Sequence, residues 1–589
     1  MNNKICIIRE KNASYPDKDT LFRPSNTYPE NPFCEEVAVK ENKVYDMVRR
    51  ALFSFGLDIE HYEQPSWNPL GVYIKPNDSV LIKPNLVYHD NGERGTKCLY
   101  THPSVVAAII DYVIIALKST GNIIVADAPL QECDFNKLVD DSGYKELIKF
   151  YQNKKVNIKL VDMRNNCTQV VAGILFPQEG REPKNKGVQI NLGNESAFSQ
   201  LDEKRMRNFR VTDFDPRILQ EHHTVDKHEY LIAQEVINAD VVINIPKPKT
   251  HRKAGITAAL KNLIGINASK EYLPHHTNGS AEEGGDAYKY QDSRLNKAND
   301  LLDKRNLAIA DKNYQMAKEF FDEYDTIVSC EEKKQRYWEG SWYGNDTIWR
   351  TVSDLNKILY YSDKNGHIQD KIQRKVIIIS DMVIAGHQEG PLAPSPINSG
   401  VIAVADHPLV HDRAICSIMG FDYEKIPSTK ATELKRGKCT LSCNENIKII
   451  SNCREWNEST LSDIRDKYSL GFVPSKGWEI VLGNKEKENF ATNIQNINKE
   501  VIIFGAGLVG IDFALYLQEK YPSIKIIGFY DNNPGLWGME IIPGVHCIKP
   551  EIIDRDYVCV IATRKNNTDV LKIQAKRLGF KTILCWSED

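Results

Sequence analysis

The sequence predicts an α/β protein in two parts, a large mixed α/β domain with a helical insertion and a small C-terminal Rossmann-like βαβ domain. Three observations predict this. Short apolar, strand-like runs alternate along the chain with helix-like runs. A charged and aromatic stretch, 280–370, interrupts the alternation, and a polar stretch, 483–500, precedes a compact unit with its own strand–turn–helix order. We therefore expect domains at 1–482 and 501–589, joined by a linker at 483–500.

The composition excludes several classes of protein. Of 589 residues, 41% are hydrophobic and 26% are charged, as in ordinary globular proteins. The net charge of -3 gives no global field that would attract nucleic acid or an anionic membrane. The first residues lack a signal-peptide pattern, and no apolar run is long enough to cross a bilayer. We expect a cytoplasmic protein without a nucleic-acid partner or a membrane span, and a homo-oligomer remains open.

The elements of the large domain follow from apolar periodicity. Helices are predicted at Val44–Leu57 and Pro103–Leu117, where apolar residues recur with a helical period. The insertion 280–370 is predicted to be mostly helical. Buried strands are predicted where short apolar runs end at a proline or a polar residue, at Ser79–Asn85, Asn122–Pro129, Val156–Asp162, Ala239–Pro246, Arg374–Asp381 and Gly400–Asp406.

Polar side chains follow several of these strands. Ligands bind at the carboxyl ends of strands in open α/β sheets, so we expect these side chains to meet in one pocket. One polar residue at a strand end is by itself more often a cap or a turn residue. The clusters are Lys83 with Asn85, Asp127, Lys247 with Lys249 and His251, Asp381, and Asp406.

The segment NIPKPKTHRKAGITAALKNLIGI, 244–266, has the densest positive charge. Four cations and a histidine lie here between a buried strand and a predicted helix. A helix N-terminus behind a basic loop attracts anions through its N–H groups and its dipole, so we expect a bound phosphate or carboxylate. His251 can then donate or accept a proton.

The position of Lys261 depends on how the chain folds. His251 and Lys261 would be roughly 15 Å apart on a straight helix. They can share a substrate only if the chain before Ala254 folds back. Thr257 and Lys261, four residues apart, lie on one helix face, which points either to the pocket or to solvent.

These stretches give a set of candidate site residues. The catalytic candidates are His251, Lys261, Lys83, Asp381 and Glu389, and the substrate-binding candidates are Asn85, Lys247, Lys249, Thr257 and Asn262. A divalent metal is a further alternative, since carboxylate oxygens are ligands that hard cations prefer. Its ligands would be Asp381, Glu389 and Asp412.

The same stretches resemble the family called domain of unknown function 362. The matching motifs span about residues 4–478 and are VLIKPNLV, IVADAP, VINIPKPKTHRKAGITAALKNLIG, GPLAPSP and VADHPLVHDRAICSIMGFD. Many relatives carry ferredoxin-type cysteine runs and are described as iron–sulfur-centre proteins. This chain has no ferredoxin-type run.

A shorter stretch, HRKAGITAALK, is similar to a segment of the nickel-pincer lactate racemase family. That resemblance implies that Lys261 carries a covalently tethered cofactor and that His251 takes part in proton transfer. The sequence departs from that family's pattern at Ala258 and Ala259, where the family has glycines, and Asn262 follows the lysine.

The C-terminal unit begins with a strand, a GxGxxG turn and a helix. Gly505, Gly507 and Gly510 allow a tight turn, the approach of a phosphate, and close helix–strand packing. Asp531 ends the next strand, where a carboxylate that binds ribose belongs. We expect three or four strands here. In the alternative reading, the glycines serve the turn alone.

This unit resembles the Rossmann-like module of nucleotide-sugar acyltransferases from surface-glycan pathways, through IIFGAGLVG, GFYDNNPGLWGMEIIPGVHCIKP and VCVIAT. The resemblance implies a bound nucleotide or nucleotide-sugar.

Together these features predict an enzyme of small-molecule or surface-glycan metabolism. It would act on a small anionic substrate by proton transfer, as a racemase, epimerase or lyase does. Two alternatives remain, an oxidoreductase with a redox or metal centre, and a non-catalytic protein that binds a nucleotide or nucleotide-sugar.

Overall fold

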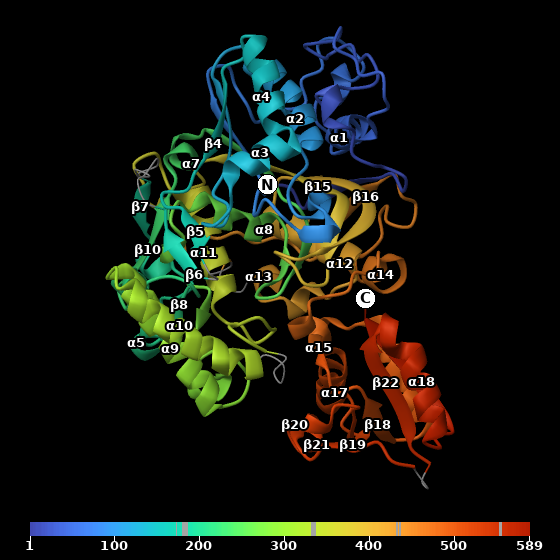
Figure 1. Ribbon diagram of the computed structural model, residues 1–589. Helices are drawn as coiled ribbons and strands as arrows, with labels where there is room; N and C mark the ends of the chain where they lie inside the picture. The colour runs from blue at the N-terminus through green and yellow to red at the C-terminus, as the bar shows by residue number, and fades with distance from the viewer. Residues whose placement is uncertain are drawn as a thin grey trace. The chain divides into compact units, whose positions relative to one another are not determined.

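The computed structural model describes residues 1–171, 174–178, 187–331, 337–430, 434, 437–552 and 556–588. The chain divides into two compact units (Figure 1). The first unit comprises residues 1–291, 302–318 and 339–476, and the second comprises residues 292–301, 319–338 and 477–589. Each unit has its own sheet and core.

A ten-stranded mixed sheet forms the centre of the first unit. Its order is β17-β1-β16-β15-β11-β2-β3-β4, and a hairpin of β12 and β13 attaches to β15. Strands β15, β11, β2, β3 and β4 run parallel, whereas β16 is antiparallel to both β15 and β1. The strands are β1 Lys4–Arg9, β2 Ser79–Pro84, β3 Asn122–Asp127, β4 Ile158–Asp162, β11 Val241–Ile245, β12 Lys249–His251, β13 Gly255–Thr257, β15 Lys375–His387, β16 Ser395–Ala405 and β17 Lys448–Ser451.

Helices cover both faces of this sheet because its central strands are apolar on both sides. Val80 and Ile82 of β2 belong to the core under the first group of helices, and Leu81 belongs to the core under the second, as the two-residue period of a strand requires. The first group, gathered at the top of Figure 1, is α1 Lys43–Ser54, α2 Pro103–Leu117, α3 Phe135–Ser142 and α4 Tyr144–Asn153. The second group includes α7 Gln234–Asn238, α8 Ala259–Asn262, α11 Ile348–Tyr361 and α12 Pro408–Met419.

Smaller elements surround the central sheet. The small sheets are β7-β10-β9, β14-β8 and β5-β6. The insertion expected to be helical contains α9 Ser293–Ala310, α10 Tyr314–Glu331 and α11, which confirms its helical character. The remaining elements are β5 Thr168–Val171, β6 Ile174–Pro177, β7 Val188–Asn191, β8 Phe209–Arg210, β9 His223–Thr224, β10 Lys227–Ile232, β14 His276–Thr277, α5 Glu203–Arg207, α6 Pro216–His222, α13 Pro427–Lys430 and α14 Leu461–Asp463.

The second unit contains a six-stranded sheet with the order β20-β21-β19-β18-β22-β23. Its parallel strands confirm the expected Rossmann-like βαβ character, but the expectation of three or four strands is wrong. The elements are β18 Glu500–Phe504, β19 Lys525–Tyr530, β20 Glu540–Ile542, β21 Val545–Ile548, β22 Val558–Arg564, β23 Thr582–Glu588, α15 Glu479–Leu482, α16 Lys485–Ile497, α17 Leu508–Lys520 and α18 Thr568–Arg577.

The segment expected to be a linker, 483–500, contains helix α16. Ala491 and Ile494 of α16 are buried in the core of the second unit, so this segment packs as part of the unit. The division into 1–482, 483–500 and 501–589 remains a prediction.

Three details of the first unit differ from expectation, and each bears on the site. Strand β15 continues to His387, because pairing with β16 extends past Asp381 with a register shift at Met382 and Ile384. Strand β16 is antiparallel to its neighbours, so Asp406 lies at the opposite edge of the sheet from the other strand-end clusters. The basic segment forms a hairpin, and α8 begins only at Ala259.

Among the described residues, no helix combines the length and the apolar character that crossing a membrane requires.

Candidate functional site

The hairpin after β11 brings distant parts of the basic segment together. In the β12–β13 register, Lys249 lies opposite Thr257, and His251 lies opposite Gly255. Gly255 has φ +79°, a conformation that suits glycine, at the start of the returning strand. The chain therefore folds back between His251 and Lys261, which is the condition under which both could serve one substrate.

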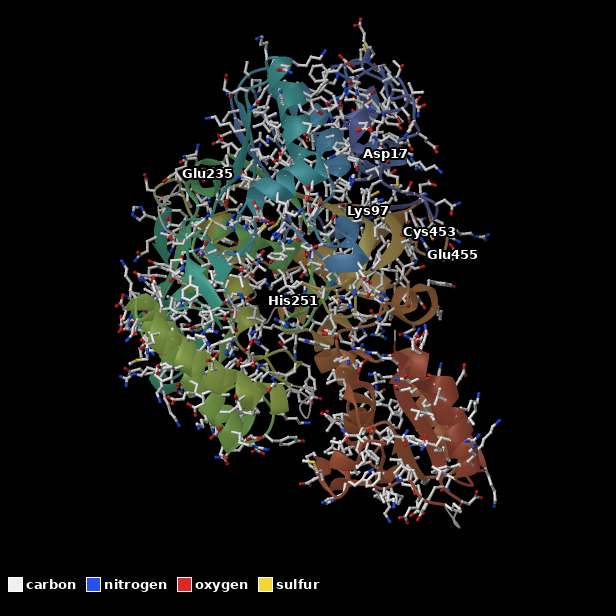
Figure 2. All side chains as sticks on the ribbon, viewed as in Figure 1. Asp17, Lys97, Glu235, His251, Cys453 and Glu455 are labelled. Carbon is white, nitrogen blue, oxygen red and sulfur yellow. The ribbon has the colours of Figure 1, made fainter. Side chains whose placement is uncertain are left out.

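A cavity of about 260 Å³ lies beside this hairpin. The ends of β2 and β3, the hairpin, α8 and the loops around His275 and Pro391 border it. His251, labelled in Figure 2, is one of its lining residues. The cavity thus lies at the carboxyl ends of parallel strands, where several of the predicted polar clusters meet.

Four lysines line this cavity: Lys249, Lys253, Lys261 and Lys270. We call them the cavity lysines. Within the described residues, none of the four forms an ion pair with a carboxylate. The carboxylates of Asp127, Glu132, Asp213 and Glu339 also line the cavity and act on these amines at longer range. Four amines in a small, partly apolar space without a direct carboxylate contact favour an anionic ligand.

Neutral acceptors hold three of the cavity lysines. Lys249 Nζ donates to Asn85 Oδ1 at 2.9 Å and to the carbonyl oxygen of Leu99. Lys270 Nζ donates to the Ala128 carbonyl oxygen at 2.8 Å, and Lys253 Nζ donates to the Glu339 carbonyl oxygen at 2.5 Å. These hydrogen bonds orient the amines without bringing a carboxylate into direct contact with them.

Lys261 differs from the other three. Its Nζ makes no hydrogen bond and no ion pair with any described residue, although it borders the cavity. Burial, together with the charges of Lys270, Lys253 and Lys83, lowers the pKa of Lys261 from 10.5 to about 7. A large part of this amine is therefore uncharged near neutral pH.

Burial also lowers the pKa values of the other cavity lysines. It brings the pKa of Lys249 to about 7, with help from Lys247. It brings the pKa values of Lys253 and Lys270 to about 8. A bound anion would reverse these shifts, because it favours the charged form of each amine.

The two histidines of the cavity are held in opposite tautomers. His251 Nδ1 accepts the backbone N–H groups of Lys253 at 3.0 Å and Ala254 at 3.1 Å, so the neutral ring carries its proton on Nε2. His275 Nδ1 lies 2.6 Å from the Leu273 carbonyl oxygen and must donate to it, so its Nε2 carries a lone pair.

Both rings remain neutral near pH 7. Burial, and then the charge of Lys261, lowers the pKa of each ring well below 6.5. Neither Nε2 atom has a hydrogen-bond partner in the part of the chain that the structure describes. The cavity therefore offers one neutral hydrogen-bond donor, His251, and one neutral proton acceptor, His275.

A network of amides and one ion pair forms the wall behind the cavity. Lys83 Nζ donates to Asp127 Oδ1 at 2.7 Å and to Asn262 Oδ1 at 3.2 Å. Asn85 Nδ2 also donates to Asn262 Oδ1, at 2.9 Å. Gly265 closes this wall, because a Cβ there would lie 1.9 Å from Asp127 Oδ1. Lys83 is thus internally paired, whereas Asn85 connects the wall to Lys249.

One hydroxyl group of the cavity lining lacks a partner. Thr257 is 4% exposed, and its Oγ1 has no hydrogen-bond partner among the described residues. Thr257 lies opposite Lys249 in the hairpin and lines the same cavity. An unsatisfied buried hydroxyl beside unpaired amines favours a ligand that accepts hydrogen bonds.

The structure brings together His251, Lys261, Lys249, Asn85, Thr257 and Asn262 around the cavity, with Lys83 behind them. It places three other candidates elsewhere. Lys247 and Asp381 form a fully buried pair at 3.0 Å, with Tyr15 donating to Asp381 Oδ1 at 2.6 Å. Glu389 does not line the cavity, and its Oε1 accepts the backbone N–H of Lys476.

Asp412 replaces the anion that was expected at the N-terminus of α8. Its Oδ1 accepts the N–H of Ala259 at 2.7 Å, and its Oδ2 accepts the N–H of Leu260 at 2.9 Å. Two N–H groups at the start of this helix are therefore satisfied by the protein itself, and the expected anion at this position remains a prediction. The cavity lysines remain as the feature that favours an anion.

The predicted metal ligands Asp381, Glu389 and Asp412 are each engaged with other groups. Over the described ranges, no three side chains of histidine, cysteine, aspartate or glutamate converge in a way that could hold a metal ion.

Sequence reasoning did not select His275 or Lys270 for the site. His275 is part of an adjacent histidine pair whose orientation is set by the Leu273 carbonyl group, which no sequence spacing reveals. Lys270 follows no predicted strand, and only the fold brings it beside Ala128.

The three glycines of the turn in the second unit differ in the space around them. A Cβ on Gly505 or Gly510 would meet a backbone oxygen at 2.6 Å or 1.9 Å, whereas a Cβ on Gly507 would meet nothing within 4 Å. Gly507 caps the N-terminus of α17, and Asp531 Oδ2 accepts the Ala506 N–H at 2.9 Å. The open side of the turn thus lies at Gly507.

A family model described as Domain of unknown function (DUF362) matches residues 80–178 and 183–417, which are more than half of the chain. This match is narrower than the span of 4–478 that the motifs indicated.

A curated relative is the Thylakoid-associated protein sll1697 of Synechocystis sp., which is 25% identical over 222 residues, or 38% of this chain and 48% of that protein. The chain thus spans about half the length of this relative.

Among solved structures, RSP, a Rex-family repressor, shares 24% identity over 22% of this chain and 62% of its own, with a TM-score of 0.14. Its complex with beta-NADH shares 23% identity over 22% of this chain and 63% of its own, with a TM-score of 0.15.

Proposed function

The chain belongs to the family described as Domain of unknown function (DUF362), and from that premise we propose that its first unit is an enzyme that moves a proton on a small carboxylate or phosphate substrate. The reaction would be of the racemase, epimerase or lyase type. The family description names no reaction, so the proposal depends on the site itself.

One observation carries the proposal: two neutral histidines with opposite tautomers border a cavity with four lysines that form no ion pair with any described carboxylate. The cavity lysines attract and hold the anion. His275 Nε2 can accept a proton from a carbon next to the anionic or carbonyl group. The His251 Nε2–H can donate a hydrogen bond to the oxygen on which negative charge develops.

The tautomer of His251 refines its expected role as an acid or base. Protonating the ring would place a hydrogen on Nδ1, which already accepts two backbone N–H groups. The imidazolium form is therefore strongly disfavoured. We assign His251 the role of a neutral hydrogen-bond donor, and we assign His275 the role of the base.

The cavity also limits the size of the substrate. Its volume of about 260 Å³ is below the range of roughly 300–1,000 Å³ that is usual for drug-sized ligands. A substrate with a few carbon atoms and one or two negative charges is consistent with this volume.

Exchange of carbon-bound hydrogen tests this function. We expect the full-length protein in D₂O to accelerate loss of the methyl protons of pyruvate, followed by NMR. His275→Gln and His251→Gln should each slow this exchange roughly 100-fold or more. His222→Gln is the matched control, because His222 pairs with Glu229 and does not line the cavity.

An unchanged rate in His275→Gln would contradict the role of His275. Calorimetric binding of pyruvate without any acceleration of exchange would favour the alternative of a non-catalytic anion-binding protein.

The geometry of the glycine turn supports a second proposal, that the C-terminal unit binds a nucleotide or nucleotide-sugar. The open position at Gly507 and the carboxylate of Asp531 lie at the same turn. We expect Gly507→Ala to leave thermal unfolding unchanged and to weaken binding of NADH or UDP-glucose in calorimetry. Gly535→Ala in a neighbouring loop is the control. Absence of binding by both nucleotides in the unmodified protein would favour the reading in which the glycines serve the turn alone.

A further inference from the structure

Among the cavity lysines, Lys261 differs in a way that charge attraction does not require. An amine that only holds an anion is best oriented by fixed acceptors, as the carbonyl oxygens orient Lys253 and Lys270. Lys261 Nζ has no such acceptor among the described residues, and it borders the cavity next to the other amines. Its nitrogen is therefore available to react.

We propose that Lys261 is a nucleophile that forms an imine with the carbonyl carbon of a small 2-oxo acid. This inference rests on the proposed function and names the substrate class of the same site. The carboxylate of the 2-oxo acid would lie among Lys249, Lys253 and Lys270, which leaves its carbonyl group to Lys261.

The surroundings of Lys261 meet the chemical requirement for such a nucleophile. An amine must be uncharged to attack a carbonyl group, and desolvation beside other cations produces that form. Burial lowers the pKa of Lys261 to about 7, and the charges of Lys270, Lys253 and Lys83 act in the same direction. The same charges would stabilise the carboxylate of the bound acid.

The step balances without an oxidant or reductant. The Lys261 nitrogen attacks the carbonyl carbon, and the electron pair of the C–O π bond moves to the oxygen. The nitrogen loses a proton to His275 Nε2, which returns it to the oxygen, so that a carbinolamine forms. The nitrogen lone pair then expels this oxygen as hydroxide, which takes a proton from solvent and leaves as water, so a protonated C=N bond remains.

The two histidines fit the same sequence of events. The His251 Nε2–H can donate to the carbonyl oxygen as it gains negative charge. After the imine forms, the nitrogen withdraws electrons from the adjacent carbon and makes its hydrogens more acidic. His275 Nε2 is then the acceptor for a proton from that carbon. The imine thus supplies the activation that proton transfer requires.

Reductive trapping tests the proposal. The full-length protein is incubated in turn with pyruvate, 2-oxobutyrate and oxaloacetate in the presence of sodium cyanoborohydride, and modified lysines are located by peptide mass spectrometry. We expect one reduced adduct, located on Lys261. Lactate, which has no carbonyl group beside its carboxylate, should give none.

Two variants separate the nucleophile from the charge. Lys261→Arg replaces the amine with a guanidinium group, which is always charged and does not form an imine. This variant should still bind pyruvate in calorimetry, but it should give no adduct. Lys270→Met removes one of the amines expected to hold the carboxylate. It should still give an adduct on Lys261, in a yield reduced by about tenfold at the same pyruvate concentration, which corresponds to about 1.4 kcal/mol of binding.

The outcomes distinguish this inference from the proposed function. Exchange of the pyruvate methyl protons without an adduct on Lys261 would overturn the imine and leave proton transfer intact. An adduct on Lys261 without exchange would support the nucleophile and overturn proton transfer. Adducts confined to other lysines, or no adduct with any of the three acids, would overturn the inference.

Discussion

Two groups of lysines lie in or near the cavity, and they differ in whether a carboxylate contacts them directly. The paired lysines, Lys83 and Lys247, contact Asp127 and Asp381 at 2.7 Å and 3.0 Å. The cavity lysines have no carboxylate partner among the described residues. Lys247 and Lys249 are separated by one residue in the sequence and belong to different groups. A direct ion pair with a carboxylate is typical of a structural lysine, whereas a lysine that only distant carboxylates affect is free to contact a charged ligand.

The largest effect is expected from breaking a pair. Lys83→Met would leave Asp127 buried without its cation, so we expect the free energy of unfolding to fall by about 3–5 kcal/mol. Urea unfolding followed by circular dichroism measures this change. Lys270→Met is the control, because it removes an amine without exposing a buried carboxylate, and the ligand-free protein should keep its stability. Equal losses in the two variants would contradict the division into groups.

A smaller effect is expected from giving the cavity lysines an internal counter-charge. Thr257 lies opposite Lys249, at the short distance that separates cross-strand neighbours. A carboxylate in Thr257→Asp would compete with the ligand for this amine. We expect the affinity for pyruvate, measured by calorimetry, to fall by about tenfold or more, on the order of 1.4 kcal/mol.

Thr257→Val is the matched control, because it keeps the shape and adds no charge. A similar loss of affinity in both variants would show that the hydroxyl group, and not the counter-charge, determines binding.

The stability of the ligand-free protein should depend on pH because of the cavity lysines. Their pKa values fall from 10.5 to about 7 for Lys249 and Lys261 and to about 8 for Lys253 and Lys270. Between these values and 10.5, the unfolded chain binds more protons than the native protein, so the ligand-free protein should gain stability as the pH rises.

An anion acts in the opposite direction, because it favours the charged amines. Binding of pyruvate should therefore take up protons near pH 8, and its affinity should fall as the pH rises above the lowered pKa values of about 7 and 8. Calorimetry in buffers with different ionisation enthalpies measures this uptake. Lys270→Met, which lacks one of the amines expected to hold the carboxylate, should take up fewer protons on binding. Binding without proton uptake would indicate that the amines are already charged in the ligand-free protein.

Much of the fold followed from apolar periodicity. Helix α2 has the predicted bounds, Pro103–Leu117, because a proline starts a mostly apolar run of helical length. Strands β2, β3 and β11 also coincide with the short apolar runs that predicted them. The end of β15 could not be predicted, since Asp381 is a polar residue inside a strand and its partners Tyr15 and Lys247 are distant in sequence.

The position of the site could be predicted from the sequence, but the role of each residue in it could not. Strand ends indicated that Asn85, Lys249 and His251 would gather, and they line one cavity. No spacing could show that Lys247 is paired and Lys249 is not, because the difference depends on which carboxylate the fold brings near. The tautomers of the histidines depend on backbone groups in the same way.

The smallest effect is expected at the surface, where water cancels charge. Lys40 and Asp17 form an ion pair at 2.7 Å, but their side chains are 73% and 63% exposed. Solvent and salt screen such a pair, so Lys40→Ala should not measurably change urea unfolding. If Lys40→Ala destabilised the protein as much as Lys83→Met, proximity of opposite charges alone would explain both results. If only Lys83→Met is destabilising, burial is what makes the partner necessary, and the unpaired cavity lysines then require a ligand for the same reason.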